Sequence, residues 1–279
     1  MVIKHNEDLK KYTSIHIGGI AANFYIPENI SELKQILVEY PDAYILSAGS
    51  NLLINDRKTF ANVIYMSELD KNITDLGDGK FYCGASVRGS KLIHEINNHG
   101  YGGIEEMISI PGMLGGLIYM NASIGNDQVC LSSFVEKVYA IKDNQELILS
   151  VSDCCFTHRC SIFHQGGYVI TGAELRFPFQ DKNISKERKT RRIDLCKTKL
   201  DYSGFNFGSV FKVCDYRLMD RLRRLNIRLG RARLSSKTTN WIIAREGATF
   251  MNVYGIVLLC KFIHKITMKK AIPEICIWK

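Results

Sequence analysis

The sequence predicts an α+β protein in which strands and helices are mixed within two blocks, with a cleft between the blocks. Three observations support this prediction. Short apolar segments alternate with helix-like segments along the chain. A highly charged stretch at 182–199 is expected to form a helix that links two lobes. The length of 279 residues suits two or three lobes, and ligand pockets often lie at the interface between such blocks.

The first block is predicted from short apolar strands and two helices. The strands lie at 43–46 and 63–66, with further apolar segments at 52–54 and 81–83, and the helices lie at 31–40 and 90–99. Ser31 is the expected N-cap of the first helix, whose apolar positions share one face, and Pro41 stops it. Gly100 closes the second helix, because glycine is common just after a helix end.

The rest of the chain continues with strands and then with the helices of the second block. The strands are predicted at 135–141, 146–151, 169–177 and 275–277, and the helices, after the charged one, at 215–225 and 248–266. The first two of these strands are expected to form a hairpin around Asp143 and Asn144, which are typical turn residues. The sequence contains no internal repeat and no low-complexity tract.

The net charge of +9 indicates anionic partners. Arginine is most concentrated at Arg217, Arg221, Arg223, Arg224, Arg228, Arg231 and Arg233. Such a cluster forms either a solvated helix face with the loop after it or a pocket for nucleotide phosphates. A nucleic-acid partner is not expected, because no basic platform with interleaved aromatic residues accompanies the arginines.

The composition argues against several classes of protein. No apolar run approaches the roughly 20 residues of a membrane span, and the polar N-terminus lacks the apolar core of a signal peptide. We therefore expect a cytoplasmic protein without membrane insertion. The nine cysteines are odd in number and include no C-x-x-C pair, which favours reduced thiols over a disulfide framework or a zinc site. No metal is therefore expected.

Two glycine-rich turns that follow apolar segments are the most informative local patterns. One is LSAGSN at 46–51, and the other lies within ISIPGMLGGLIYMNA at 108–122. Glycine lets backbone N–H groups approach a phosphate or a flat polar ring closely. Glycine-rich turns also serve simply to let two elements pack. Neither turn fits G-x-G-x-x-G or the P-loop pattern, so neither predicts a Rossmann or a P-loop site.

Six motifs in a fixed order decide between these alternatives. They are TSIHIGG at 13–19, LSAGSNLL at 46–53, IPGMLGG at 110–116 with YMNA at 119–122, RCSIF at 159–163, GSVFK at 208–212 and PEI at 273–275. In this order the chain closely resembles the UDP-N-acetylenolpyruvoylglucosamine reductase family, the MurB flavoenzymes of bacterial peptidoglycan synthesis. The resemblance spans nearly the whole chain, and the ordered set is far more specific than any one motif.

The resemblance implies a fold, a domain division and a reaction. The expected fold is a two-lobed FAD-binding domain of the vanillyl-alcohol-oxidase type at 1–185, with lobes of about 1–67 and 68–185, and a small α/β substrate domain at 186–279. The implied reaction is the NADPH-driven reduction of the enolpyruvyl ether of UDP-N-acetylglucosamine, with FAD bound non-covalently. A monomer is expected. The short tail after Glu274 resembles the compact branch of the family.

The resemblance also assigns residues. By motif match Ser209 donates a proton, and Arg159 and Glu274 stabilise the charge that follows hydride addition. The residues that match the family's FAD site are Ser47, Ala48, Gly49, Ser50, Asn51, Leu52, Ile110, Pro111, Gly112, Gly115, Gly116, Asn121 and Ala122. Lys212, Arg233 and Asn240 match positions that bind the substrate. Outside this ordered set, Ser209 would be read as a turn hydroxyl and Arg159 and Glu274 as surface charges.

The chain departs from the family pattern at positions expected to shape the substrate pocket. His158 precedes Arg159 where tyrosine is usual, and Val213-Cys214 stands where Asn-Pro is usual. Arg233 and Thr238 replace a usual glutamine and histidine. Replacing an amide by valine removes both a donor and an acceptor. Two alternatives to the family reaction therefore stay open: a related flavin oxidoreductase for a different nucleotide-linked or anionic substrate, or a catalytically idle binding relative.

Overall fold

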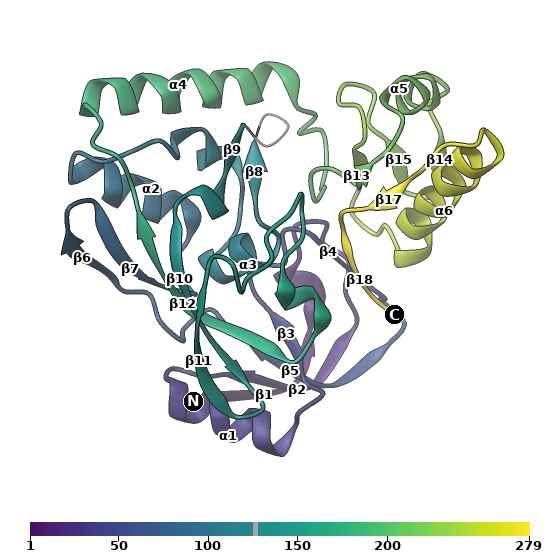
Figure 1. The fold of residues 1–279 in the computed structure, drawn as a ribbon. Helices are drawn as coiled ribbons and strands as arrows, with labels where there is room; N and C mark the ends of the chain where they lie inside the picture. Colours follow the sequence, from purple (N-terminus) through teal and green to yellow (C-terminus); the bar gives the residue numbers. More distant parts are fainter. Residues whose placement is uncertain (125–127) are drawn as a thin grey trace. The chain divides into compact units, whose positions relative to one another are not determined.

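The computed structural model describes residues 1–124 and 128–279 (Figure 1). It contains α-helices and both parallel and antiparallel β-sheet pairs. The α-helices are α1 Ile30–Glu39, α2 Gly89–Asn98, α3 Leu114–Tyr119, α4 Lys182–Lys199, α5 Tyr216–Arg224 and α6 Phe250–Ile266. The strands are β1 Val2–Asp8, β2 Ile20–Ile26, β3 Tyr44–Leu46, β4 Leu52–Ile54, β5 Thr59–Tyr65, β6 Ile73–Gly77, β7 Lys80–Gly84, β8 Ser123–Ile124, β9 Val129–Cys130, β10 Val135–Lys142, β11 Gln145–Ser150, β12 Tyr168–Arg176, β13 Phe211–Val213, β14 Arg228–Leu229, β15 Ala232–Leu234, β16 Ile242–Ala244, β17 Ile272–Pro273 and β18 Cys276–Trp278. The short 3-10 helices are η1 Leu9–Tyr12, η2 Glu105–Ser109, η3 Leu131–Ser133 and η4 Ile162–Gln165.

Contacts divide the chain into two compact units. Unit 1 comprises Met1–Lys4, Asn23–Ala48 and Ala61–Cys196, and unit 2 comprises His5–Ala22, Gly49–Phe60 and Lys197–Lys279. Two amino-terminal segments, 5–22 and 49–60, therefore belong to the same unit as the carboxy-terminal part. This division differs from the boundary expected at 185/186, which falls inside α4. The assignment of one domain to FAD and one to substrate stays a prediction.

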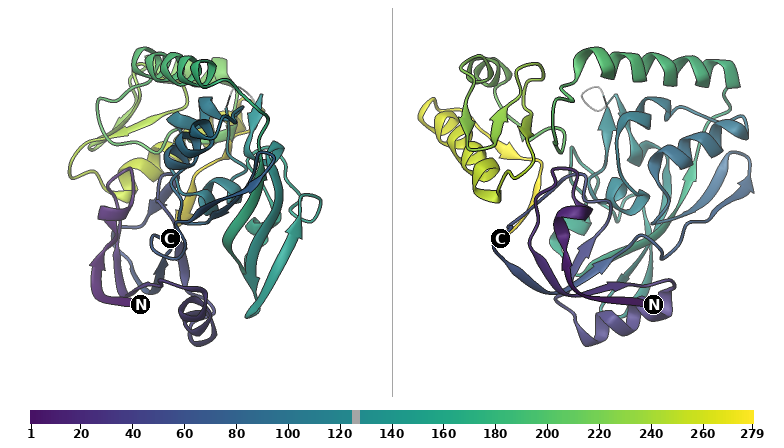
Figure 2. Two further views of the ribbon diagram at one scale, coloured as in Figure 1. Left: turned by 90° about the vertical axis from the view of Figure 1, so that its left-hand side faces the viewer. Right: turned by 180° about the vertical axis from the view of Figure 1, so that it is seen from behind.

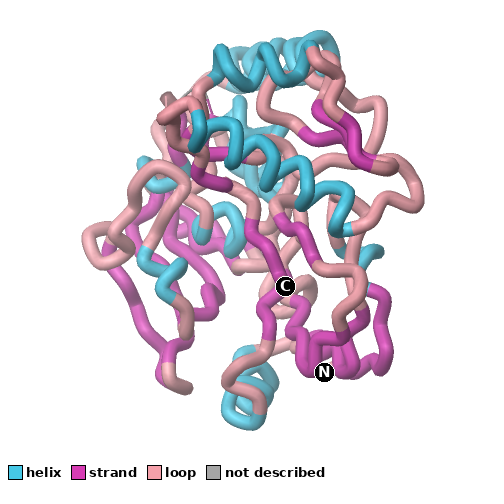
Figure 3. The backbone as a smooth tube through the Cα atoms, turned by 90° about the vertical axis from the view of Figure 1, so that its right-hand side faces the viewer, coloured by secondary structure: helices cyan, strands magenta, loops and turns pink. Residues whose placement is uncertain are grey.

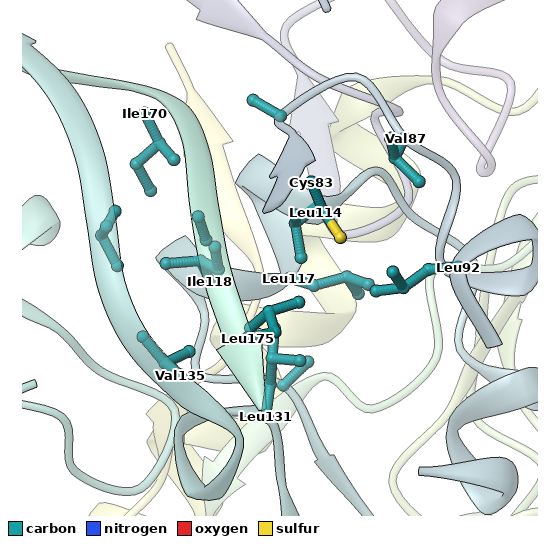
Figure 4. Close-up of a cluster of buried hydrophobic side chains, with 14 of the residues drawn as sticks. Cys83, Val87, Leu92, Leu114, Leu117, Ile118, Leu131, Val135, Ile170 and Leu175 are labelled. Carbon is teal, nitrogen blue, oxygen red and sulfur yellow. The ribbon is translucent and has the colours of Figure 1, made fainter. Parts of the chain in front are cut away.

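The main sheet of unit 1 has five strands in the order β11-β10-β12-β7-β6, and every neighbouring pair is antiparallel. The predicted hairpin is confirmed, since Asp143 and Asn144 both have positive φ between β10 and β11. Helices α2 and α3 pack on one face of this sheet (Figure 2). Their side chains form the largest described core, in which Leu92, Leu114 and Leu175 are nearly inaccessible (Figure 4).

Helix α1 confirms a predicted helix but begins at a different cap. The Asn29 side chain accepts the N–H of Glu32 at 3.0 Å, so Asn29 is the N-cap and the expectation of Ser31 at this position was wrong. Asparagine satisfies an orphan N–H at the first turn as well as serine does. Leu33 and Ile36 are buried in a small core with Tyr25 of β2. The sheet order β1-β2-β5-β3 includes two strands, β1 and β2, that sequence patterns did not predict.

Helix α4 spans the predicted charged stretch, Lys182–Lys199. Its residue Ser185 is 1% exposed, and its hydroxyl donates to the Glu105 carboxylate at 3.1 Å. Glu105 also accepts the N–H of Gly103 at 3.1 Å and an amide N–H of Asn97 at 2.9 Å. A buried carboxylate with this many donors is well compensated, and it ties α4 to the loop that follows α2.

Unit 2 is built on three small sheets and two helices. Its sheets are β14-β15-β16, β13-β17 and β18-β4, of which the last pair is parallel. Helix α5 is capped by Asp215, and α6 by Thr249 in a capping box. The buried His264 of α6 accepts the Asp215 N–H at 3.2 Å through Nε2, which joins the two helices. Ile15, Ile17 and Leu53 extend this core from the amino-terminal segments.

No helix in the described part of the chain combines the length and the hydropathy that a membrane-crossing segment needs.

Candidate functional site

The glycine-rich segment of unit 1 contains the short helix α3 and not only a turn. Leu114 and Ile118 are fully buried against the sheet, because residues four apart share one face of a helix. The Gly115 N–H donates to the Ala85 carbonyl at 2.9 Å, which holds the start of α3 on the sheet. The predicted FAD residues Ile110, Pro111 and Gly112 lie in the loop before α3, and Gly115 and Gly116 lie in its first turn.

Within unit 1, Gly116 meets the other glycine-rich turn. A Cβ atom added at Gly116 would lie 3.2 Å from the Ser47 hydroxyl, which is tighter than ordinary packing. Ser47 and Ala48 are half-buried, and the described part of the chain offers no hydrogen bond to the Ser47 hydroxyl. The two glycine-rich turns therefore pack closely here, and the Ser47 hydroxyl remains available to a polar ligand group.

Asn121 and Ala122 anchor the end of this segment. Asn121 has a φ of 40°, a conformation that asparagine tolerates, and it is 5% exposed. Its amide donates to the Thr157 carbonyl at 3.0 Å and accepts the Ser132 N–H at 3.2 Å. Ala122 is buried beside it. Asn121 therefore holds the segment that carries Arg159, in addition to its predicted place at FAD.

Arg159 lies at the tip of a tight turn. Thr157 and Cys160 exchange two backbone hydrogen bonds, and Arg159 between them has a φ of 50°. The Arg159 Nη2 atom donates to the Ser123 carbonyl at 3.0 Å. The Ser161 hydroxyl donates to the Tyr119 carbonyl at 2.7 Å. These two hydrogen bonds join the Arg159 loop to the end of α3 and to the start of β8.

Residues 49–51 of the first glycine-rich turn belong to unit 2, where hydrogen bonds to Ser14 and to Glu274 hold them. The Ser14 N–H donates to the Gly49 carbonyl at 3.1 Å, and the Ser14 hydroxyl donates to the Ser50 carbonyl at 3.2 Å. On the other side the Asn51 amide donates to the Glu274 carbonyl at 3.0 Å. Leu52 begins β4, which pairs with β18 from Cys276 on, two residues after Glu274. Residues 223 positions apart are therefore neighbours.

Ser209 and Glu274 lie on adjacent segments of unit 2. The Glu274 N–H donates to the carbonyl of Val210, the residue after Ser209, at 2.8 Å. The pairing of β13 with β17 continues this contact, with Phe211 opposite Pro273. Both Ser209 and Glu274 are half-buried. Two of the three residues expected at the reacting atoms are thus brought together by backbone pairing, while Arg159 belongs to unit 1.

Asn240 positions the segment that follows Ser209. Its amide oxygen accepts the Phe211 N–H at 3.0 Å, its amide nitrogen donates to the Phe211 carbonyl at 2.8 Å, and its backbone carbonyl accepts the Val210 N–H at 2.9 Å. Asn240 is only 2% exposed and has a φ of 66°. Its predicted contact with substrate stays a prediction, whereas these bonds give it a positioning role.

The charges of Lys212 and Glu274 act in opposite directions on the pKa of the Cys276 thiol. Burial raises the pKa of the Cys276 thiol to about 11, the Glu274 carboxylate adds to the rise, and the Lys212 ammonium opposes it. Cys276 is therefore a neutral thiol at physiological pH and no nucleophile.

Arg233 is part of an internal network. Its guanidinium donates to the Ser203 hydroxyl at 2.9 Å and pairs with the Asp201 carboxylate at 3.4 Å. Burial would raise the pKa of Asp201, but hydrogen bonds from Ser203 and Ser235, with the charge of Arg233, lower it below the usual range. Any substrate phosphate would share Arg233 with Asp201. Sequence patterns gave no signal for Asp201, because two of its partners, Arg233 and Ser235, are 32 and 34 residues away.

Among residues 1–124 and 128–279, no three His, Cys, Asp or Glu side chains gather as metal ligands.

Comparisons with known proteins place this arrangement in context. No family model matches the chain. A UDP-N-acetylenolpyruvoylglucosamine reductase of Pseudothermotoga lettingae is 30% identical over 248 residues, which cover 86% of this chain and 85% of the relative. A reductase of the same name from Chlamydia felis is 30% identical over 268 residues, with 91% and 86% covered. The crystal structure of MurB from Thermus caldophilus covers both chains completely, with a TM-score of 0.82 and 23% identity, which shows a shared fold.

Proposed function

Because this chain belongs to the UDP-N-acetylenolpyruvoylglucosamine reductase family, we propose that it reduces the enolpyruvyl ether of UDP-N-acetylglucosamine to UDP-N-acetylmuramate. FAD would be bound non-covalently, and NADPH would be the reductant. The proposal keeps the expectation of a cytoplasmic monomer in peptidoglycan precursor synthesis. The observation that carries it is the hydrogen bond of Glu274 to Val210, the residue after Ser209, which makes the two segments neighbours in unit 2.

The residues proposed to hold FAD fit that group. Ser47 offers a hydroxyl without another partner in the described chain, and Gly116 lies directly against it, where a Cβ atom would come within 3.2 Å of that hydroxyl. The same turns present backbone N–H groups, which suit the pyrophosphate and the polar edge of a flavin. When bound, FAD would supply the redox chemistry by passing a hydride from NADPH to the methylene carbon of the enolpyruvyl group.

The chain's own residues would manage the charge and the proton. Hydride addition leaves negative charge spread over the neighbouring carbon and the carboxylate of the substrate. The Arg159 guanidinium remains charged and offers planar, bidentate donors to that carboxylate. Preorganised donors of this kind contribute roughly 3–4 kcal/mol each. Ser209 is proposed to donate the proton that completes the D-lactyl ether, with Lys212, three residues further along the chain, to assist.

A serine hydroxyl is a weak acid, so its placement matters more than its acidity. It can protonate only a strongly basic carbon that lies within hydrogen-bond reach. The clamp of Asn240 on Val210 and Phe211 supports such placement, because it removes freedom from the residues directly after Ser209. Glu274 can donate a hydrogen bond to the developing charge only when it is protonated. Glu274→Gln, whose amide always donates, should therefore retain more activity than Glu274→Ala.

The proposal is tested by separating the two half-reactions under anaerobic conditions. The purified protein should carry a flavin that NADPH bleaches, and UDP-N-acetylglucosamine enolpyruvate should restore its absorbance. A flavin that is reduced but not reoxidised by this substrate would support the relative with a different substrate. A protein that neither carries nor binds FAD would support the catalytically idle relative.

A further inference from the structure

Helix α6 of unit 2 has two opposite apolar faces. The inner face is buried and includes Phe250, Val253, Ile256, Val257 and Cys260. The opposite side carries Met251, Leu258, Leu259, Phe262 and Ile266, which are 40–62% exposed. We call these five residues the outer face of α6. Their spacing of 7, 1, 3 and 4 residues places them on one side of the helix. Surface helices ordinarily present charged residues there, so a contiguous apolar face indicates a binding surface.

Positive charge borders the outer face. Lys261 and Lys265 are exposed and lie on one flank of the helix between the inner and outer faces. On the same flank the Lys279 ammonium lies 4.9 Å from the centre of the Tyr254 ring. Helix α6 contains no Asp or Glu. Residues 197–279 carry 17 Lys and Arg against five Asp and Glu, a formal excess of 12 positive charges in a chain whose net charge is +9.

Strand β14 extends this surface. Gly255 lies on the outer side of α6, and a Cβ atom there would overlap the Leu229 side chain. Leu229 is therefore packed over the helix at this point while remaining 45% exposed. Its neighbour Arg228 is exposed, and so is Arg231 after the turn. The exposed apolar and cationic residues therefore continue from α6 to the adjacent β14–β15 hairpin. Figure 3 shows the backbone of this part of unit 2.

We propose that the outer face of α6, with Lys261, Lys265 and Lys279 beside it, binds the surface of an anionic lipid bilayer. A helix with aromatic and aliphatic side chains on one side and lysines beside them lies in the interface plane, with its apolar side below the headgroups. Each lysine near such a surface contributes attraction to anionic headgroups. The contact would hold the protein at the surface without any segment crossing the bilayer.

The charge distribution favours a bilayer over a second copy of this chain. A two-fold contact through the outer face would bring two copies of the strongly positive segment 197–279 against each other. Like charges in contact are destabilising. The apolar side chains also project from a single convex helix. A fluid bilayer accommodates a convex surface, whereas a protein partner would need a matching groove.

The test uses the full-length protein and sedimentation with vesicles of phosphatidylcholine alone or mixed with phosphatidylglycerol. We expect binding to the mixed vesicles only, with a loss on added salt because the attraction is screened. Phe262→Glu should weaken binding at least tenfold. Lys261→Ala and Lys265→Ala should each weaken it about fivefold. The matched control is Val38→Glu on α1, which introduces the same charge at a 62% exposed helical position and should bind as wild type does.

Three results would overturn the proposal. One is equal binding to vesicles with and without the anionic lipid. Another is unchanged binding of the Phe262→Glu protein. The third is a concentration-dependent dimer in light scattering that Phe262→Glu abolishes, without vesicle binding by the wild-type protein, which would make a second copy the occupant. Circular dichroism of each variant shows that the comparison is made between folded proteins.

Discussion

Asn240 shows how one buried residue shapes the candidate site. Its amide makes two hydrogen bonds to the backbone of Phe211, and its positive φ of 66° suits asparagine far better than most residues. The sequence motif marked the position, but it did not indicate that the amide would bind backbone. That outcome depends on the approach of two segments 29 residues apart, which local patterns do not encode.

Removing the Asn240 amide should destabilise the protein. Asn240→Ala leaves a buried N–H and carbonyl of Phe211 without their partners, at about 1–3 kcal/mol for each group. Asn240→Gly relieves the backbone strain and should recover no more than about 1–2 kcal/mol of the loss. Urea unfolding measures both values, with Thr239→Ala as a neighbouring control. Full recovery in the glycine variant would show that only the backbone conformation matters.

Ser209 is proposed to act in one half-reaction only. Ser209→Ala should leave the reduction of bound flavin by NADPH nearly unchanged, since no proton from Ser209 enters that step. Reoxidation by the enol ether should slow by about 10²–10⁴, the usual contribution of a positioned general acid. Stopped-flow absorbance separates the two rates. Ser236→Ala, at an exposed serine of the same unit, is the control, and equal losses in both half-reactions would remove Ser209 from its role.

Asp201 links the stability of unit 2 to pH. Because its pKa is lower in the folded protein than in the unfolded chain, the charged form stabilises the fold at pH values above the usual carboxyl pKa of about 3.9. This contribution is lost as the pH falls through the lower folded-state value. The difference in urea midpoint between wild type and Asp201→Asn should therefore shrink between about pH 5 and pH 3. Asp42→Asn at an exposed position is the control, and a difference that does not vary with pH would contradict the assignment.

At the scale of elements, local signals predicted the helices better than the sheets. The charged helix and the hairpin lie where the sequence indicated. Strand β1 gave no signal because most of its residues are polar and exposed, so only pairing with β2 makes it a strand. Helix α3 was expected as a turn, since its glycines weaken the helix pattern. Burial of Leu114 and Ile118 outweighs that weakness.

The turn between β3 and β4 should tolerate almost no side chain at Gly49. A Cβ atom there would overlap the Tyr12 carbonyl, and the φ of 59° is unfavourable for alanine. Gly49→Ala should cost at least about 3 kcal/mol. Gly77→Ala is the matched control, because its φ of 85° is also positive but no atom lies within 4 Å of the added Cβ. That variant should lose only about 1–2 kcal/mol. Equal losses in thermal or urea unfolding would show that packing against Tyr12 is unimportant.

At the scale of the whole molecule, the motif order carried more information than composition or periodicity. It indicated that residues as distant as Asn51 and Glu274 belong to one region, and their hydrogen bond in unit 2 agrees with this. The division into units could not be predicted, because segments 5–22 and 49–60 join the carboxy-terminal part through long-range packing. The positive excess in residues 197–279 was visible in the arginine cluster, but the exposed apolar face of α6 required the structure.

The most direct test of the proposed reaction is the stoichiometry of turnover. The purified protein is given NADPH with and without UDP-N-acetylglucosamine enolpyruvate, and the nucleotide sugars are identified by mass spectrometry. The account predicts NADPH oxidation that depends on the enol ether, with one UDP-N-acetylmuramate formed for each NADPH consumed. NADPH oxidation that ignores the enol ether, or an enol ether that is recovered unchanged from a flavin-loaded protein, would contradict it.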